Sequence, residues 1–176
     1  ALTAKIWKDG DALYAYSVSP AVSQARSVCV SGGDVYAAGS LQSGLTKPLA
    51  VVWKNDKAHY TLSDGETPAG VNALCLSGRT LYAAGHSGGA AAVWKDKELL
   101  YTLTDGTNDA WAYAVCVSDG TVYAAGYERQ GDRIVAKVWE NGTLKYTPGA
   151  PGADSYAYSV FAANGSLYTA GSEESG

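Results

Sequence analysis

The five residues Val35–Gly39 read VYAAG, and the same five letters return at 122–126. Closely related segments stand at 81–85 (LYAAG) and 167–171 (LYTAG). Tyrosines at 36, 82, 123 and 168 and tryptophans at 7, 53, 94 and 139 are separated by the same three intervals, 46, 41 and 45 residues. Two series with one spacing indicate a single structural unit repeated four times.

Each repeat divides into four short segments, which we call strands A to D. Strand A is typified by RSVCVS at 26–31, strand B by VYAAG at 35–39, strand C by AVVWK at 50–54 and strand D by AHYTLS at 58–63. All are rich in Val, Tyr and Thr, and turn pairs such as Asn141-Gly142 separate them. This pattern predicts four-stranded antiparallel sheets joined by tight hairpins.

Units of this length and strand number correspond to propeller blades. We therefore predict an all-β fold, a four-bladed β-propeller of four-stranded antiparallel blades, forming one domain over residues 1–176. The expected repeats are 20–62, 63–103, 104–148, and 149–176 together with 1–19. The small AAG residues of strand B are expected near the ring axis, where a wedge-shaped blade is narrowest.

The two ends of the chain are incomplete in complementary ways. The chain begins with strands C and D, and it stops just after a strand B. We expect residues 1–19 to complete the last blade and to close the ring within one chain, which would then be a monomer. The same complementarity allows an alternative, in which two copies join as an eight-bladed ring.

Composition argues against two classes of partner. The net charge is −4 with both signs scattered along the chain, so there is no basic stripe to bind nucleic acid. No apolar run reaches membrane-spanning length, so membrane insertion is not expected.

Two long segments carry a resemblance to a known family. They are YAVCVSDGTVYAAGYERQGDRIVAKVWENG at 113–142 and YSVFAANGSLYTAGS at 158–172. This text resembles the bacterial β-propeller repeat family, and the resemblance extends over the whole chain. It implies a propeller on a secreted or cell-surface bacterial protein. The chain differs from the family in its strand-C tryptophans, and in Ser31, Ser77, Ser118 and Ala163, where the family often has Asp.

Residues able to carry chemistry are few. Cys29, Cys75 and Cys116 share one strand-A position with Phe161, so we interpret them as small buried hydrophobic residues and expect no metal and no cofactor. His59 and His86 stand at unrelated positions of the repeat and are expected to be solvated. No acid and base are paired, so no catalytic residue and no enzyme activity are predicted.

The positions that break the repeat lie just before and within strand A. Symmetric packing does not require such different residues there, and we expect them to surround the mouth of the axis. The candidate ligand-binding residues are Arg26, Asn72, Trp111, Tyr113, Tyr156 and Tyr158. Aromatic faces beside Arg and Asn suit a glycan or a peptide, which predicts a non-catalytic, lectin-like binding or scaffolding module.

Two other interpretations stay open. The variable positions could be a solvent-filled rim, in which case the chain is a purely structural repeat domain of a larger surface protein. The less favoured third interpretation is a glycan-active enzyme.

Overall fold

The computed structural model describes residues 2–16 and 20–174, and within them the chain forms sixteen β-strands and no helix. The first eight are β1 (Ala4–Lys8), β2 (Asp11–Tyr16), β3 (Val22–Ser31), β4 (Asp34–Gln42), β5 (Leu49–Lys54), β6 (Lys57–Thr61), β7 (Ala69–Ser77) and β8 (Thr80–Ser87). The others are β9 (Ala90–Lys95), β10 (Glu98–Thr102), β11 (Ala110–Ser118), β12 (Thr121–Gln130), β13 (Arg133–Glu140), β14 (Thr143–Tyr146), β15 (Ser155–Ala163) and β16 (Ser166–Glu173). The same residues include no helix that could cross a membrane.

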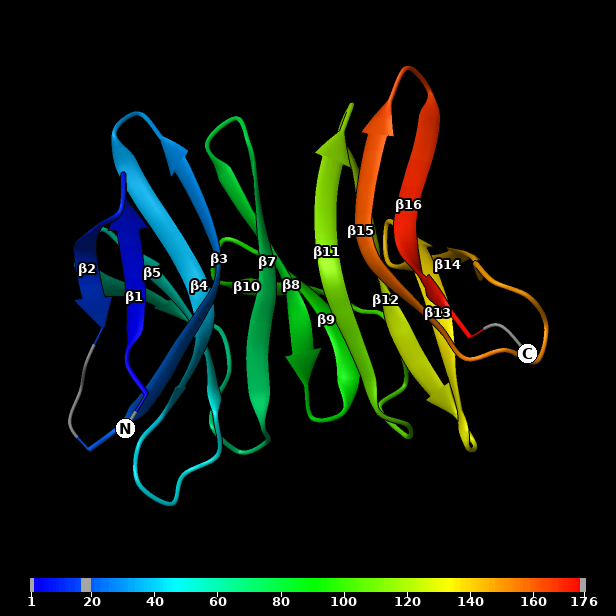
Figure 1. Cartoon of the computed structure of the whole chain (residues 1–176), viewed down its shortest axis with the longest axis horizontal. Helices are drawn as coiled ribbons and strands as arrows, with labels where there is room; N and C mark the ends of the chain where they lie inside the picture. The colour runs from blue at the N-terminus through cyan, green and yellow to red at the C-terminus, as the bar shows by residue number, and fades with distance from the viewer. Residues whose placement is uncertain (1, 17–19, 175–176) are drawn as a thin grey trace.

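These strands form three complete four-stranded sheets and two half-sheets (Figure 1). The complete sheets are β3–β6, β7–β10 and β11–β14, and every neighbouring pair in them is antiparallel. The half-sheets are β1–β2, which hold the C and D positions, and β15–β16, which hold the A and B positions. The predicted all-β class and the four-stranded antiparallel sheets are confirmed.

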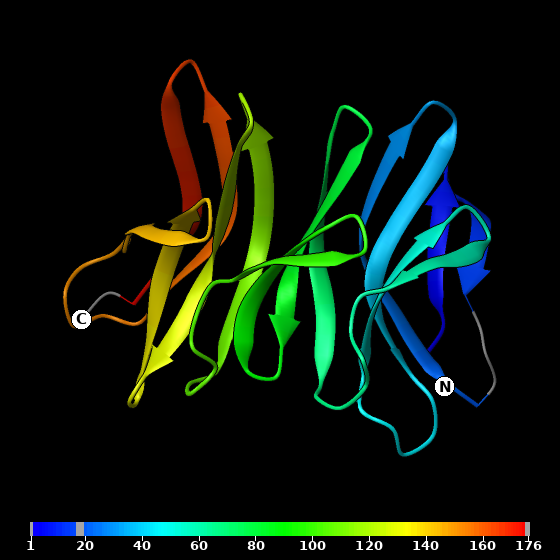
Figure 2. The same cartoon turned by 180° about the vertical axis from the view of Figure 1, so that it is seen from behind.

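The sheets follow one another face to face along the molecule. The A strands β7, β11 and β15 each contact strands A, B and C of the preceding sheet, as β7 does with β3, β4 and β5. The strand-D hairpins, at β6, β10 and β14, lie on the far side, toward the viewer in Figure 2. Neighbouring sheets contact one another through their A strands (β3 with β7, β7 with β11, and β11 with β15). The A strands are therefore the inner ones, and not the B strands that were predicted to lie near the axis.

The half-sheets lie at opposite ends of an open arc (Figures 1 and 2). In the described part of the chain no strand pairing joins β16 to β1, so the expected closure within one chain differs from the structure. The expected closing segment, 1–19, includes residues 1 and 17–19, which lie outside the described residues. The first strands β7, β11 and β15 each contact three strands of the sheet before them, and after four steps from sheet to sheet the two half-sheets are still far apart (Figure 1).

The core consists of layers between successive sheets. The strand-C tryptophans Trp53, Trp94 and Trp139 are only 3%, 1% and 2% exposed, and each packs on the unit before it. The first of these layers joins the β1–β2 half-sheet to the first complete sheet, since the ring of Tyr16 stacks on Trp53 with centroids 4.8 Å apart. Trp7 packs on no preceding sheet in the described part of the chain and is 61% exposed.

Candidate functional site

A β-bulge interrupts every A strand at the same place. The register with strand B shifts between Ala25 and Ser27 in β3, and the same shift recurs in β7, β11 and β15. A bulge inserts one residue and turns its side chain out of the regular alternation. The inserted residues are Arg26, Asn72, Tyr113 and Tyr158, four of the six candidates predicted from sequence.

The same bulge explains the invariant glycine of the VYAAG motif. A Cβ on Gly126 would lie 1.8 Å from the carbonyl oxygen of Trp111, the residue two before the bulge. Gly39, Gly85 and Gly171 have the same environment, at 1.8–1.9 Å from the equivalent carbonyls. Real Cβ atoms do not approach backbone oxygen so closely, so only glycine fits. The bulge, rather than the narrowing of a wedge-shaped blade, is therefore the reason for the repeated glycine.

Polar contacts join the first of the inserted residues to those of the following sheets. Arg26 Nη1 donates to Asn72 Oδ1 at 3.0 Å, and Asn72 Nδ2 donates to the carbonyl oxygen of Ala112 at 2.9 Å. The guanidinium carbon of Arg26 lies 5.7 Å from the centroid of the Trp111 ring, a cation–π distance. The first three sheets are thus linked across this face.

Aromatic side chains extend this series of contacts from Trp111 to the last half-sheet. The Tyr113 centroid lies 6.2 Å from that of Trp111 and 5.5 Å from that of Tyr158. Tyr156 and Tyr158 are stacked, with centroids 5.5 Å apart and planes at 7°. All six predicted residues are therefore brought together in one continuous row, which we call the aromatic row.

Three further residues belong to the row and were missed. The ring of His86 stacks on Trp111 at 4.2 Å and 8°, and Tyr127 packs against Tyr113 and Tyr156 at 5.6 and 5.5 Å. Asp109 accepts hydrogen bonds from Tyr127 Oη at 2.7 Å and from Trp111 Nε1 at 3.1 Å. A signal was present in the sequence, because His86 and Tyr127 directly follow the invariant glycine.

The expectation that both histidines are solvated is right for His59 and wrong for His86. His59 is exposed and rests against Tyr60, whereas His86 is half-buried. Its Nδ1 is buried and has no hydrogen-bond partner among the described residues. Burial, reinforced by the Arg26 charge, lowers the pKa of His86 to about 4, so its imidazole is neutral at pH 7.

The row borders a hollow of about 280 Å³ between the first and second complete sheets. It exists because the facing residues there are Ser40 and Gly70, whereas the next junction places His86 against Trp111 at the equivalent positions. Gln24 and Arg26 supply amide and guanidinium donors to its wall. The hollow thus combines an aromatic side with hydrogen-bonding side chains, as small-molecule sites do.

The neutral state of His86 makes stability depend on pH. The unfolded chain binds a proton at His86 below about pH 6.5 and the folded chain only near pH 4, so stability falls as the pH is lowered through this window. We expect urea unfolding to show a loss of about 2 kcal/mol from pH 7 to pH 4.5 due to His86, less than the full shift because the ring keeps some solvent contact.

The measurement compares wild type with His86→Phe, which retains an aromatic ring but cannot titrate. The variant should lose that part of the slope, while His59→Phe should keep most of it because His59 is exposed. Equal slopes for wild type and His86→Phe would contradict the assigned burial of the imidazole.

The cysteines occupy positions unlike a metal site. Cys29, Cys75 and Cys116 are free and half-buried in the layers between sheets. Burial raises the pKa of Cys29 to about 11 and also raises the pKa values of Cys75 and Cys116. All three thiols are therefore protonated at neutral pH. Among residues 2–16 and 20–174, no group of three His, Cys, Asp or Glu is placed to hold a metal ion.

Comparison with known proteins assigns the chain to no family. No protein-family model matches the chain. No curated protein sequence matches it either. The resemblance to bacterial propeller repeats stays a prediction, and the site is argued from its own residues.

Proposed function

We propose that the chain is a non-catalytic binding module, that its sheets are blades of a β-propeller, and that the aromatic row binds a glycan. The observation that carries the proposal is the convergence of residues that break the repeat. Six of them, on four A strands far apart in sequence, form one continuous series of contacts. Packing between identical blades does not require this clustering, whereas a ligand would.

The chemistry of the row favours a glycan. Tyr158 is 49% exposed and carries the ring most accessible to a ligand, while His86 covers one face of Trp111. Ring faces stack on the apolar side of a sugar, and Gln24 in the wall of the hollow offers a neutral amide to its hydroxyl groups. Arg26 is the single cation of the row, so a strongly anionic ligand is not favoured. A peptide is the second candidate ligand.

We propose a non-catalytic module because the polar groups of the row already form hydrogen bonds with one another. Both carboxylate oxygens of Asp109 accept hydrogen bonds from within the row, and its Tyr127 partner has a raised pKa because of burial and that carboxylate. These groups hold rings in place rather than standing free to transfer protons. The resemblance to bacterial surface propellers favours the cell surface or the exterior as the setting.

The test is a fluorescence titration with a panel of neutral oligosaccharides and a panel of peptides. Trp53, Trp94 and Trp139 are buried, and Trp7→Phe removes the exposed tryptophan outside the row. In this background Trp111 is the tryptophan whose fluorescence can respond to a ligand at the row. We expect a saturable change with at least one oligosaccharide, and binding about 10-fold weaker or worse in Tyr158→Ala.

The matched control is Leu144→Ala, which removes an exposed apolar side chain from the outer strand β14 and should leave binding unchanged. A response confined to peptides would replace the glycan by a peptide ligand. No response to either panel would reject binding at the row and favour the structural-domain interpretation.

A further inference from the structure

The two half-sheets together contain the four strands of one blade. β15 and β16 hold the A and B positions, and β1 and β2 hold the C and D positions. Within the described residues β16 is paired with β15 alone and β1 with β2 alone, so each presents one unpaired edge. These are the two edges that face each other, as strands B and C, inside every complete sheet.

The complete sheets define how such edges meet. Strand B pairs with strand C so that Tyr36 stands opposite Lys54, and the same register recurs in the second and third sheets. Applied to the ends of the chain, this register places Tyr168 opposite Lys8 and Gly171 opposite Lys5. Unpaired edges of this length are templates for pairing with another chain.

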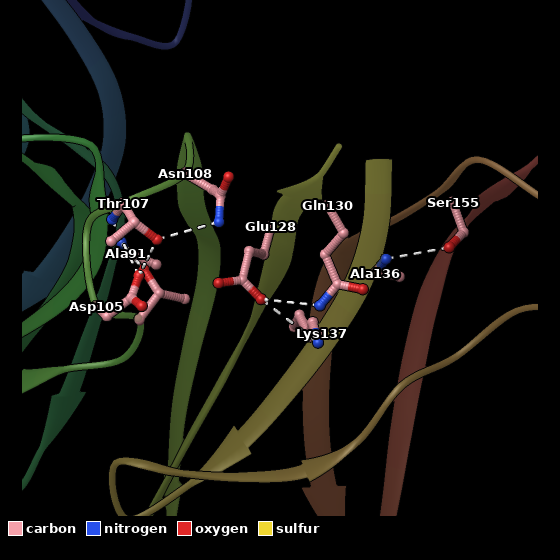
Figure 3. A network of polar contacts seen from close by, with 10 residues as sticks. Ala91, Asp105, Thr107, Asn108, Glu128, Gln130, Ala136, Lys137 and Ser155 are labelled. Carbon is pink, nitrogen blue, oxygen red and sulfur yellow. Dashed lines mark hydrogen bonds and ion pairs between the residues drawn. The ribbon is translucent and has the colours of Figure 1, made fainter. Parts of the chain in front are cut away.

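Charge is complementary in that register. In the third sheet Lys137, only 7% exposed, pairs with Glu128 at an Nζ–Oε2 distance of 3.5 Å (Figure 3). Lys137 stands two residues before its tryptophan and Glu128 two residues after its glycine. Lys5 and Glu173 stand at the same two positions, at opposite ends of the chain, and both are exposed. Glu173 already accepts a hydrogen bond from the Ala150 N–H, which holds its carboxylate at the β16 edge.

A hairpin contact is likewise divided between the ends. In the complete sheets the side chain after strand C, that of Asn55, Asp96 or Asn141, accepts a hydrogen bond from the first strand-B residues at 2.9–3.0 Å. Asp9 holds the equivalent position with φ 54°, the same left-handed turn conformation as Asn55. The corresponding donor is the N–H of Leu167 on β16, so acceptor and donor are both present but lie on different half-sheets.

Apolar exposure marks the same two surfaces. Trp7 is 61% exposed at one end, and Phe161 and Tyr168 are 64% and 60% exposed at the other. In the second sheet the equivalents of Trp7 and Tyr168, which are Trp94 and Tyr82, are 1% and 9% exposed. Large apolar side chains gathered on both ends are typical of surfaces that a partner covers.

We propose that β16 of one copy pairs with β1 of a second copy, so that the two half-sheets form one blade. The partner is another copy rather than the chain's own tail, because the two edges lie at opposite ends of the arc (Figure 1). Two such junctions, related by a two-fold axis, close two chains into one ring. Three complete sheets per copy and two joint sheets make an eight-bladed ring, at the upper end of the usual range of blade numbers.

Sedimentation of the full chain tests the proposal. We expect a species of twice 18.2 kDa. Lys5→Glu places like charges together at both junctions and should raise the dissociation constant of the dimer about 100-fold. Lys5→Glu with Glu173→Lys should restore the dimer because it restores opposite charges. Lys97→Glu, on a side chain 69% exposed and far from either edge, is the matched control and should have no effect.

Cross-linking identifies the strands that meet. Lys8→Cys with Tyr168→Cys places two thiols directly opposite each other, within disulfide reach of neighbouring strands. Under oxidising conditions we expect a link between two chains, and neither single variant should form it. A monomer in sedimentation, a dimer insensitive to Lys5→Glu, or a disulfide within one chain would each overturn the proposal.

Discussion

Replacing Gly126 by alanine is expected to destabilise the protein by about 4 kcal/mol or more. The new Cβ would meet three backbone atoms: the carbonyl oxygen of Trp111 at 1.8 Å, its carbon at 2.8 Å and the Ala112 Cα at 2.9 Å. Backbone atoms cannot rotate away as a side chain can, so the clash is relieved only by removing the bulge. Urea unfolding followed by circular dichroism measures the loss.

Gly70→Ala is the matched control for that substitution. Gly70 also lies in a strand with an ordinary backbone φ, but its added Cβ meets a side-chain atom, His86 Cε1, at 3.1 Å. Because His86 can shift, we expect a loss of about 1 kcal/mol. If Gly126→Ala does not fold, Gly171→Ala in the terminal half-sheet provides the same clash at 1.9 Å with fewer contacts at risk. Equal losses at Gly126 and Gly70 would contradict the bulge as the cause of the invariant glycine.

The second large effect is expected at Trp94. Its side chain is 1% exposed and fills the layer between the first two complete sheets, among Ala38, Val52 and Leu81. Trp94→Ala removes the whole ring and leaves a cavity that the rigid sheets cannot close, so we expect a loss of about 3–5 kcal/mol in urea unfolding. Because domains of this kind are stable by about 5–15 kcal/mol, this is a large share of the total.

Leu99→Ala controls for that loss within the same sheet. Leu99 lies on the outer strand β10 and is 54% exposed, so its truncation should change stability by no more than about 0.5 kcal/mol. Trp94→Phe, which keeps part of the ring, should fall between the two. A loss at Trp94 no greater than that at Leu99 would mean that the layer between the sheets does not hold them together.

The positions of strands and hairpins followed from local sequence. Turn pairs such as Asn141-Gly142 adopt the positive φ angles that two-residue hairpins need, at 48° and 83°. The short Val- and Tyr-rich segments between such turns became strands, although the A strands begin three or four residues earlier than predicted and the B strands end two to four residues later. Both features depend on neighbouring residues alone, which one copy of the repeat already contains.

The candidate site could be predicted from the sequence because its residues differ between copies of the repeat. One position of the repeat holds three kinds of residue, as Arg26, Asn72, Tyr113 and Tyr158, and this difference is visible in the sequence alone. That the position is a bulge was not visible, since a bulge depends on the register between two strands. His86 was misjudged for a related reason: its burial comes from stacking on Trp111, a residue of the next sheet.

The sequence by itself determined the repeated antiparallel unit, its four strands and the residues on which copies differ, because hairpin turns and strand alternation are short-range properties repeated four times. Only the tertiary structure decided which strand lies inside, which rings meet, and that the chain forms an open arc. The reason is physical: the angle between sheets results from many small contacts across each layer, and a modest change in that angle, added over successive junctions, separates the two ends of the chain.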